Sequence, residues 1–273
     1  MKRPFEVAPE TFSLPSSLPV PLPGFGHVPI NSYLIKSREP VLIDAGTAIE
    51  KEEWLKTLES LIDPKELKWI WITHDDADHT GNLQDVLRMA PNAKIVTNII
   101  GVARMETAWP IHLDQCYLMK QGETLDVGDR TLTAFRPPVF DSPATMGAYD
   151  DKSKACFSSD CFGAFVPEPV EDANDVPQDA LVQGFGMFNT ANHPWIHLVD
   201  HSKFESVLKV IREMDPQTIL SSHLPPAHGR TDEFLKALAA LPDSDPFLGF
   251  NQAEVDDIMA QVNIGQAPEI GGS

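Results

Sequence analysis

The sequence predicts a layered α/β or α+β sandwich, and three observations lead to this expectation. Short apolar runs typical of strands recur in both halves of the chain. Segments with apolar residues at helical spacing follow these runs in both halves. The chain has 273 residues, 42% of them hydrophobic, and can bury a substantial core. We therefore expect one domain over residues 1–245 and a small C-terminal tail over residues 246–273.

The first half of the chain predicts a hairpin followed by alternating helices and strands. Proline and glycine are frequent at the start, and two short apolar runs, NSYLI and PVLIDAG, then flank KSRE as in a hairpin. Trp54, Leu55, Leu58 and Leu61 stand at helical spacing. The run LKWIWIT predicts a strand, and GNLQDVLRMAP predicts a helix that ends at Pro91. A strand at AKIVTN and a helix at IIGVARMET continue the pattern.

A meander of three strands is predicted next, in ETLDV, RTLTAFRP and KACFSSD. Apolar spacing then predicts helices at SKFESVLKVIREM and TDEFLKALAAL, on either side of a strand at QTILSS. His193, His197 and His201 recur every four residues, but Pro194 and its apolar neighbours favour a strand or an irregular approach to the next helix. The last stretch, NIGQAPEIGGS, predicts a loose tail or an arm that orders against a partner.

The composition of the chain indicates which binding partners and which cellular compartment to expect. The formal charge of −19 argues against nucleic acid and against an anionic membrane surface. The chain has no run of eighteen apolar residues, and its start lacks an apolar core of signal-peptide length, so we expect a cytoplasmic protein without a membrane partner. Cys116, Cys156 and Cys161 form no CxxC pair, and we expect buried free thiols.

The segment WITHDDADHTG, residues 71–81, places two histidines and three aspartates directly after an apolar run. These acids would repel one another unless they faced water or a cation neutralised them, and the apolar run argues against open water. If the run is a strand, His74, Asp76 and Asp78 converge on one side of the loop. His74 and Asp76 could then reach one cation, while Asp78 and His79 reach a second. The alternative is a solvated acidic turn with two surface histidines, but this combination of residue types favours a metal site.

This segment resembles the signature of the metallo-β-lactamase superfamily, H-x-H-x-D-H. It is more similar to the diiron domain of flavodiiron proteins, which carries H-x-E-x-D-H-x-G. Five further segments match in the family's order: NSYLI, VLIDAG, PATMGAYD, CFSSDCFG and ILSSHLPP. The resemblance implies an αββα sandwich of the α+β class, in which two mixed β-sheets pack face to face with helices on the outside.

The resemblance also implies that two metal ions are held by seven side chains, namely His74, Asp76, Asp78, His79, Asp141, Asp160 and His223. Asp160 would bridge both metals, and Asp76 stands where flavodiiron proteins have glutamate. Asp141 departs from the pattern, because the family usually has a histidine there, and we keep it as a ligand of the first metal. Asp44 would order the surrounding loops.

Beyond the metal ligands we expect no catalytic residue. The Tyr149 hydroxyl could hydrogen-bond a ligand on the first metal, although lining the core is the alternative for this residue.

Three histidines set against four carboxylates suit iron or manganese better than zinc, so we expect a diiron centre, with zinc or manganese as alternatives. Two such ions could attack an ester, thioester or phosphoester as Lewis acids, or could each give an electron to O₂. The resemblance implies binding or reduction of O₂ or NO, including a role in oxygen sensing. A metal-dependent hydrolase of the same superfamily is the alternative.

Flavodiiron proteins draw electrons from an FMN-bearing flavodoxin domain, which needs on the order of 150 further residues. We find no segment that resembles a phosphate loop for FMN, and we expect no FMN in this chain. Electrons would then come from an external donor, or the protein would act with a signalling partner. Flavodiiron proteins usually form head-to-tail dimers, so a homodimer stays open for this chain.

Overall fold

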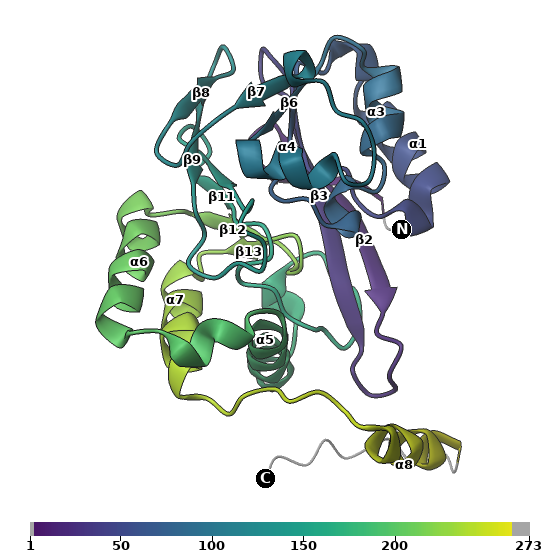
Figure 1. Cartoon of the computed structure of the whole chain (residues 1–273), viewed down its shortest axis with the longest axis vertical. Helices are drawn as coiled ribbons and strands as arrows, with labels where there is room; N and C mark the ends of the chain where they lie inside the picture. Colours follow the sequence, from purple (N-terminus) through teal and green to yellow (C-terminus); the bar gives the residue numbers. More distant parts are fainter. Residues whose placement is uncertain (1–2, 264–273) are drawn as a thin grey trace.

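The computed structural model describes residues 3–263 and arranges them as two β-sheets between two sets of helices (Figure 1). The first sheet has the strand order β1-β2-β3-β4-β5-β6-β7. In chain order these strands are Phe5–Ala8, Thr11–Pro19, His27–Ile35, Val41–Ile43, Trp69–Trp71, Lys94–Thr97 and Cys116–Leu118. The second sheet has the order β13-β12-β11-β10-β9-β8. Strands β8 to β13 are Thr124–Asp126, Thr131–Phe135, Gly147–Asp150, Ala155–Phe157, Thr218–Leu220 and Ala227–His228.

Both sheets combine parallel and antiparallel strand pairs. The helices beside the first sheet are α1 to α4, Lys51–Leu61, Ala77–Thr80, Leu83–Met89 and Ile99–Met105. Those beside the second sheet are α5 to α7, Gln178–Asn192, His201–Met214 and Thr231–Ala240. The predicted αββα sandwich of two mixed sheets is therefore confirmed. Within residues 3–263, no helix combines the length and the apolar character that crossing a membrane would need.

Side-chain alternation along each strand separates the core into layers. On β4, Leu42 packs with Trp54 of α1, whereas Ile43 on the opposite face packs between the sheets with Phe157 of β11. On β11 the neighbour of Phe157, Cys156, faces the other way and packs with helices α5 to α7. Both faces of these short strands are buried, which explains their continuous apolar sequences.

The proline-rich start forms two strands, β1 and β2, that we did not predict. Proline is tolerated in β2 because β1 pairs only with Thr11–Ser13, so β2 is an edge strand beyond Ser13. Helix α5 was also not predicted. Between α5 and α6 the chain forms a 3₁₀ helix, Pro194–Leu198, which is the irregular alternative rather than the strand.

The predicted tail contains a helix, α8, Gln252–Asn263. An extended segment joins α8 to α7, and α8 lies apart from the sandwich (Figure 1). On this segment the ring of Phe250 meets the edge of Phe25 in the β2–β3 turn, with centroids 5.3 Å apart. All but the first residue of NIGQAPEIGGS lies outside the described residues.

A network of ion pairs connects the second sheet to the turn between β1 and β2. Arg130 Nη1 lies 2.9 Å from Asp150 Oδ2, and both side chains have no exposed area. Arg130 Nη2 lies 2.5 Å from Glu10 Oε2. Lys152 Nζ lies 2.6 Å from Asp129 Oδ2 at the edge of this network. The network replaces apolar packing at this point, so its energetic effect depends on every charge keeping a partner.

Asp129 should make stability depend on pH. Burial raises the pKa of Asp129, but hydrogen bonds from Lys152 and from the Arg38 backbone N–H outweigh burial and lower it to about 2. An aspartate in the unfolded chain has a pKa of about 3.9. The stabilisation by the Asp129 charge is therefore complete above that pH and is lost as pH falls through about 2. We expect Asp129→Asn to reduce the free energy of unfolding by roughly 1–2 kcal/mol at pH 7 and by much less at pH 2. Urea unfolding at both pH values tests this.

Asp245→Asn is the matched control, because Asp245 is exposed. Equal losses for Asp129→Asn at pH 7 and at pH 2 would contradict the assignment.

Candidate metal centre

The loops that carry the predicted ligands leave the two sheets at one edge of the sandwich. His74 follows β5, Asp160 follows β11 and His223 follows β12. Because β11 and β12 are parallel, the loops after them begin at the same edge. The structure brings all seven predicted side chains into three overlapping groups, and within each group the ligand atoms lie within 4.8 Å of one another. These groups are His74, His79 and Asp160; Asp78, His79 and His223; and His74, Asp76 and Asp141.

Three imidazole nitrogens surround one carboxylate oxygen. The Nε2 atoms of His79, His223 and His74 lie 3.0, 3.3 and 3.9 Å from Oδ1 of Asp160. His74 Nε2, His79 Nε2 and Asp160 Oδ1 are buried and have no hydrogen-bond partner. Ligand bonds of about 2.0–2.3 Å place neighbouring donors roughly 3–4 Å apart, which matches these spacings. The donor set therefore fits a bound cation.

The other ring nitrogen of each histidine is held by the protein. His79 Nδ1 lies 2.8 Å from Asp44 Oδ2, and His223 Nδ1 lies 2.7 Å from the backbone oxygen of Pro29. His74 Nδ1 lies 3.0 Å from Ser159 Oγ. Because the carboxylate of Asp44 and the carbonyl of Pro29 can only accept, Nδ1 of His79 and of His223 carries a hydrogen and donates a hydrogen bond. Nε2 of these two rings is then free for a metal, which is the usual arrangement of ligating histidines.

Asp44, Thr73 and Ser159 form one hydrogen-bonded chain behind the histidines. The Ser159 hydroxyl donates to Thr73 Oγ1 at 3.0 Å, and Thr73 Oγ1 donates to Asp44 Oδ2 at 2.8 Å. Asp44 Oδ1 also accepts the Thr73 backbone N–H at 2.8 Å. Asp44 thus contacts the loop after β5 through both of its oxygens, while Thr73 and Ser159 were not predicted.

The third group is more open to solvent. The side chains of Asp76 and Asp141 keep 46% and 20% of their area exposed, against 6% for Asp160. His74 Nε2 lies 3.7 Å from an oxygen of each of them. A cation in this group would be held mostly by exposed carboxylates. We therefore expect it to bind more weakly than a cation held by His79 and His223.

Asp75 lies in the same acidic segment but does not join any of the three groups. Both its oxygens accept from Arg104 Nε at 2.7 Å, and Oδ1 also accepts from Ser142 Oγ at 2.8 Å. Because Ser142 adjoins Asp141, this contact helps to position the loop of a predicted ligand.

The charges of the cluster shift its pKa values in opposite directions. Burial raises the pKa of Asp160, but His223, His74 and His79 outweigh burial and hold it well below its usual range. Burial lowers the pKa of His223, but Asp160 and Asp78 outweigh it and raise that pKa to about 9. Protons therefore compete with a cation at these histidines, and acid should weaken metal binding.

Asn192, at the end of α5, contacts the cluster and was not predicted. Its Nδ2 donates to Asp160 Oδ2 at 3.0 Å, which leaves Oδ1 towards the histidines. Trp195 follows three residues later, and its Nε1 donates at 3.0 Å to the backbone oxygen of Phe140, the residue before Asp141.

Tyr149 is not brought into the cluster. On β10 its neighbour Ala148 faces the layer between the sheets, so strand alternation turns Tyr149 outwards to the layer of helices α5 to α7. Burial raises the pKa of Tyr149, and the acidic groups that add to this effect are Cys156, Asp215, Asp150 and Asp151, none of which is a predicted ligand. The alternative expectation, a core-lining residue, agrees better with this position.

We expect Asp44→Asn to weaken metal binding by about 10- to 100-fold, because the new amide cannot accept from all the donors that meet Asp44. Chelator competition against Fe²⁺ without oxygen measures this change. Asp85→Asn is the matched control, because Asp85 forms only surface ion pairs with Lys51 and Arg88. Unchanged affinity in Asp44→Asn would contradict the role of Asp44 in orienting His79.

Comparisons with known proteins agree with the fold. The profile of a family described as "ODP family beta lactamase" matches residues 28–223. An uncharacterized protein of Methanocaldococcus jannaschii is 28% identical over 71% of this chain and 48% of its own length. The rubredoxin-oxygen oxidoreductase of Megalodesulfovibrio gigas is 25% identical over 75% of this chain and 46% of its own.

Among solved structures, the flavodiiron protein of Giardia intestinalis superposes with a TM-score of 0.77 at 20% identity, over 89% of this chain and 60% of that one. This likeness shows the shared fold. The chain spans about half the length of the first curated relatives it matches.

Proposed function

The chain belongs to the ODP family of β-lactamase-like proteins, and from this premise we propose that it holds two iron ions that bind or reduce O₂ or NO. One observation carries the proposal. Nitrogen atoms of three histidines surround Oδ1 of Asp160, and three of these four donor atoms are buried without a hydrogen-bond partner. Asp76, Asp78 and Asp141 complete the donor set, which then includes four carboxylates, and such an oxygen-rich set favours iron or manganese over zinc.

Each residue has a distinct part in this proposal. His74, Asp76 and Asp141 would hold the first ion, and Asp78, His79 and His223 the second, with Asp160 between them. Bound iron would supply electrons and an open coordination position for O₂ or NO. The Nδ1 contacts with Asp44 and with the Pro29 carbonyl would orient His79 and His223 so that their Nε2 atoms face the ions. Asn192 holds Asp160 through its second oxygen.

The relatives support a redox role over hydrolysis. One of them is named as an oxidoreductase that acts between rubredoxin and oxygen, and another as a flavo-diiron protein, FprA2 of Clostridium acetobutylicum. For this chain we propose a separate redox protein as the electron donor. Oxygen sensing would use the same site without sustained turnover, and the ratio of O₂ bound to O₂ consumed separates the two roles.

The test is to purify the protein without oxygen, load it with Fe²⁺, count the metals and mix it with O₂ or NO in a stopped-flow spectrometer. We expect about two irons per chain and an absorption change that saturates at one O₂ per iron pair. Zinc held in place of iron, with turnover of an ester or thioester and no response to O₂ or NO, would replace this proposal with hydrolase activity.

A further inference from the structure

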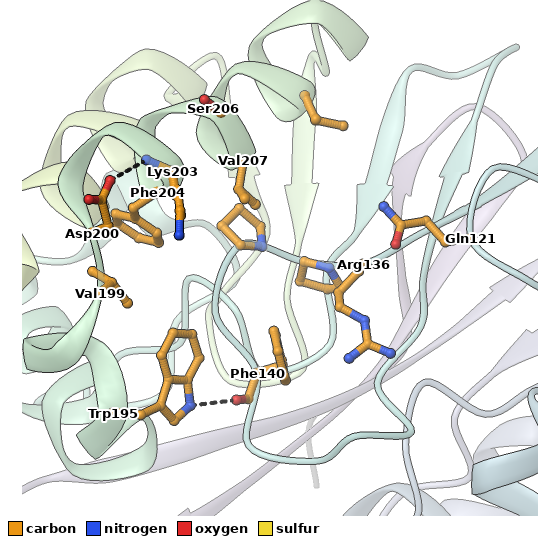
Figure 2. Close-up of a pocket in the computed structure, with 13 residues that line it drawn as sticks. Gln121, Arg136, Phe140, Trp195, Val199, Asp200, Lys203, Phe204, Ser206 and Val207 are labelled. Carbon is orange, nitrogen blue, oxygen red and sulfur yellow. Dashed lines mark hydrogen bonds between the residues drawn. The ribbon is translucent and has the colours of Figure 1, made fainter.

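A second site lies beside the candidate metal centre, in a cavity of about 510 Å³ between helix α6 and the loop that follows β9 (Figure 2). This volume lies within the range of small-molecule pockets. None of the residues that line the cavity is a predicted metal ligand. The cavity is therefore distinct from the metal site, although Phe140 in its wall is the residue before Asp141.

The walls of the cavity are largely apolar and partly aromatic. Phe204 and Val207 of α6 form one side, and Phe140 and Trp195 lie opposite (Figure 2). The indole Nε1 of Trp195 is bonded to the Phe140 backbone oxygen, and the two rings lie with centroids 5.2 Å apart. The two rings are inclined by 46°, and they offer apolar contact to a ligand at little cost in side-chain entropy.

The charged groups of the cavity favour an anion. The Arg136 guanidinium lies over the Phe140 ring, 4.8 Å from its centroid, and Lys203 lines the opposite side. The one carboxylate in the wall, Asp200, is engaged at the start of α6, where it accepts from the Lys203 backbone N–H at 3.0 Å and from Ser202 Oγ at 2.5 Å. Among the described residues, the Lys203 ammonium has no ion-pair partner.

This local charge is opposite to that of the whole molecule, which carries a formal −19. Long-range repulsion disfavours an anion approaching the surface, so the anion must find its favourable contacts within the cavity itself. A carboxylate beside Lys203 would form a charge-assisted hydrogen bond, while an apolar body rested on Trp195 and Phe140.

We propose that this cavity binds a small organic anion, with an apolar ring system seated on Trp195 and Phe140 and a carboxylate group directed to Lys203. Such a ligand would touch the loop that carries Asp141, next to the candidate metal centre. Its binding does not require iron, and failure of the proposed function would leave this inference standing.

The test uses 1-naphthylacetate as the probe and its neutral amide, 1-naphthylacetamide, as the uncharged comparison, with titration calorimetry on the full chain. We expect the acid to bind about 10-fold more tightly than the amide, since one charge-assisted contact is worth roughly that ratio. Lys203→Glu should remove this preference for the acid, while the affinity for the amide changes by less than about twofold. Val207→Trp should place an indole ring in the cavity and weaken the binding of both compounds.

Lys209→Glu is the matched control, because Lys209 lies on the same helix but pairs with Glu213 at the surface. Circular dichroism of each variant verifies that α6 is intact. Equal affinity for the acid and the amide, an unaltered acid affinity in Lys203→Glu, or no binding of either compound to the unmodified chain would overturn the proposal.

Discussion

Replacing Asp160 with alanine should deprive the protein of both metal ions at once. Oδ1 of Asp160 lies 3.0–3.9 Å from the Nε2 atoms of His79, His223 and His74, so it could contact both an ion held by His74 and an ion held by His79 and His223. Without it the rings face one another with no negative charge between them, and each ion loses a ligand. We expect less than about a tenth of the metal content of the unmodified protein. Metal analysis after dialysis against a weak chelator measures the loss.

Two further variants make this result specific. Asp160→Asn keeps the shape of the side chain but removes its charge, and it should lose nearly as much metal as Asp160→Ala. Asp175→Ala, an exposed aspartate in a 3₁₀ turn, should lose none. Circular dichroism of both Asp160 variants should match that of the unmodified protein, because the apolar core packing is unchanged in them. Loss of only one ion in Asp160→Ala would show that this carboxylate does not bridge.

Replacing Arg130 with methionine should cause the largest loss of stability among the variants considered. The change leaves the carboxylate of Asp150 buried without its guanidinium partner, because both side chains are fully inaccessible to solvent. Breaking a buried pair in this way costs about 3–5 kcal/mol. Urea unfolding followed by circular dichroism measures the free energy of unfolding.

The double variant Arg130→Met with Asp150→Leu should recover most of that loss, since it removes both charges together. Arg88→Met is the surface control, because the Arg88 side chain is 66% exposed beside Asp85, and such pairs contribute about 0–1 kcal/mol. A loss below about 1 kcal/mol in Arg130→Met would contradict the energetic importance of this pair.

Much of the fold could be predicted because local patterns and layer packing agree. Apolar runs such as that of β5 have both faces buried, and the helices carry one apolar face each, as α1 does with Trp54 and Leu58. Strands β1 and β2 could not be predicted from composition, because proline argues against a strand unless pairing leaves its side of the strand free. The backbone of β2 beyond Ser13 is unpaired on this side because β1 is short, and the local sequence does not indicate the length of β1.

The candidate site was predictable to the extent that its residues stand close together in sequence. The ligands between His74 and His79 could be recognised within one short segment, whereas Asp160 and His223 were found through the family resemblance. Asn192 gave no signal, because an asparagine near the end of a helix is common and its contact with Asp160 exists only after α5 packs on the second sheet. The register of β10 turns the Tyr149 side chain to the outer face of the sheet. Its closeness in sequence to Asp141 did not indicate this orientation.

The most direct test of the metal centre is anomalous diffraction at the iron edge, from crystals of protein loaded with Fe²⁺ without oxygen. The structure predicts two peaks about 3.5–4 Å apart, one near His74 and the other near His79 and His223, with Asp160 between them. A single peak, or no peak with these side chains turned apart, would contradict the account.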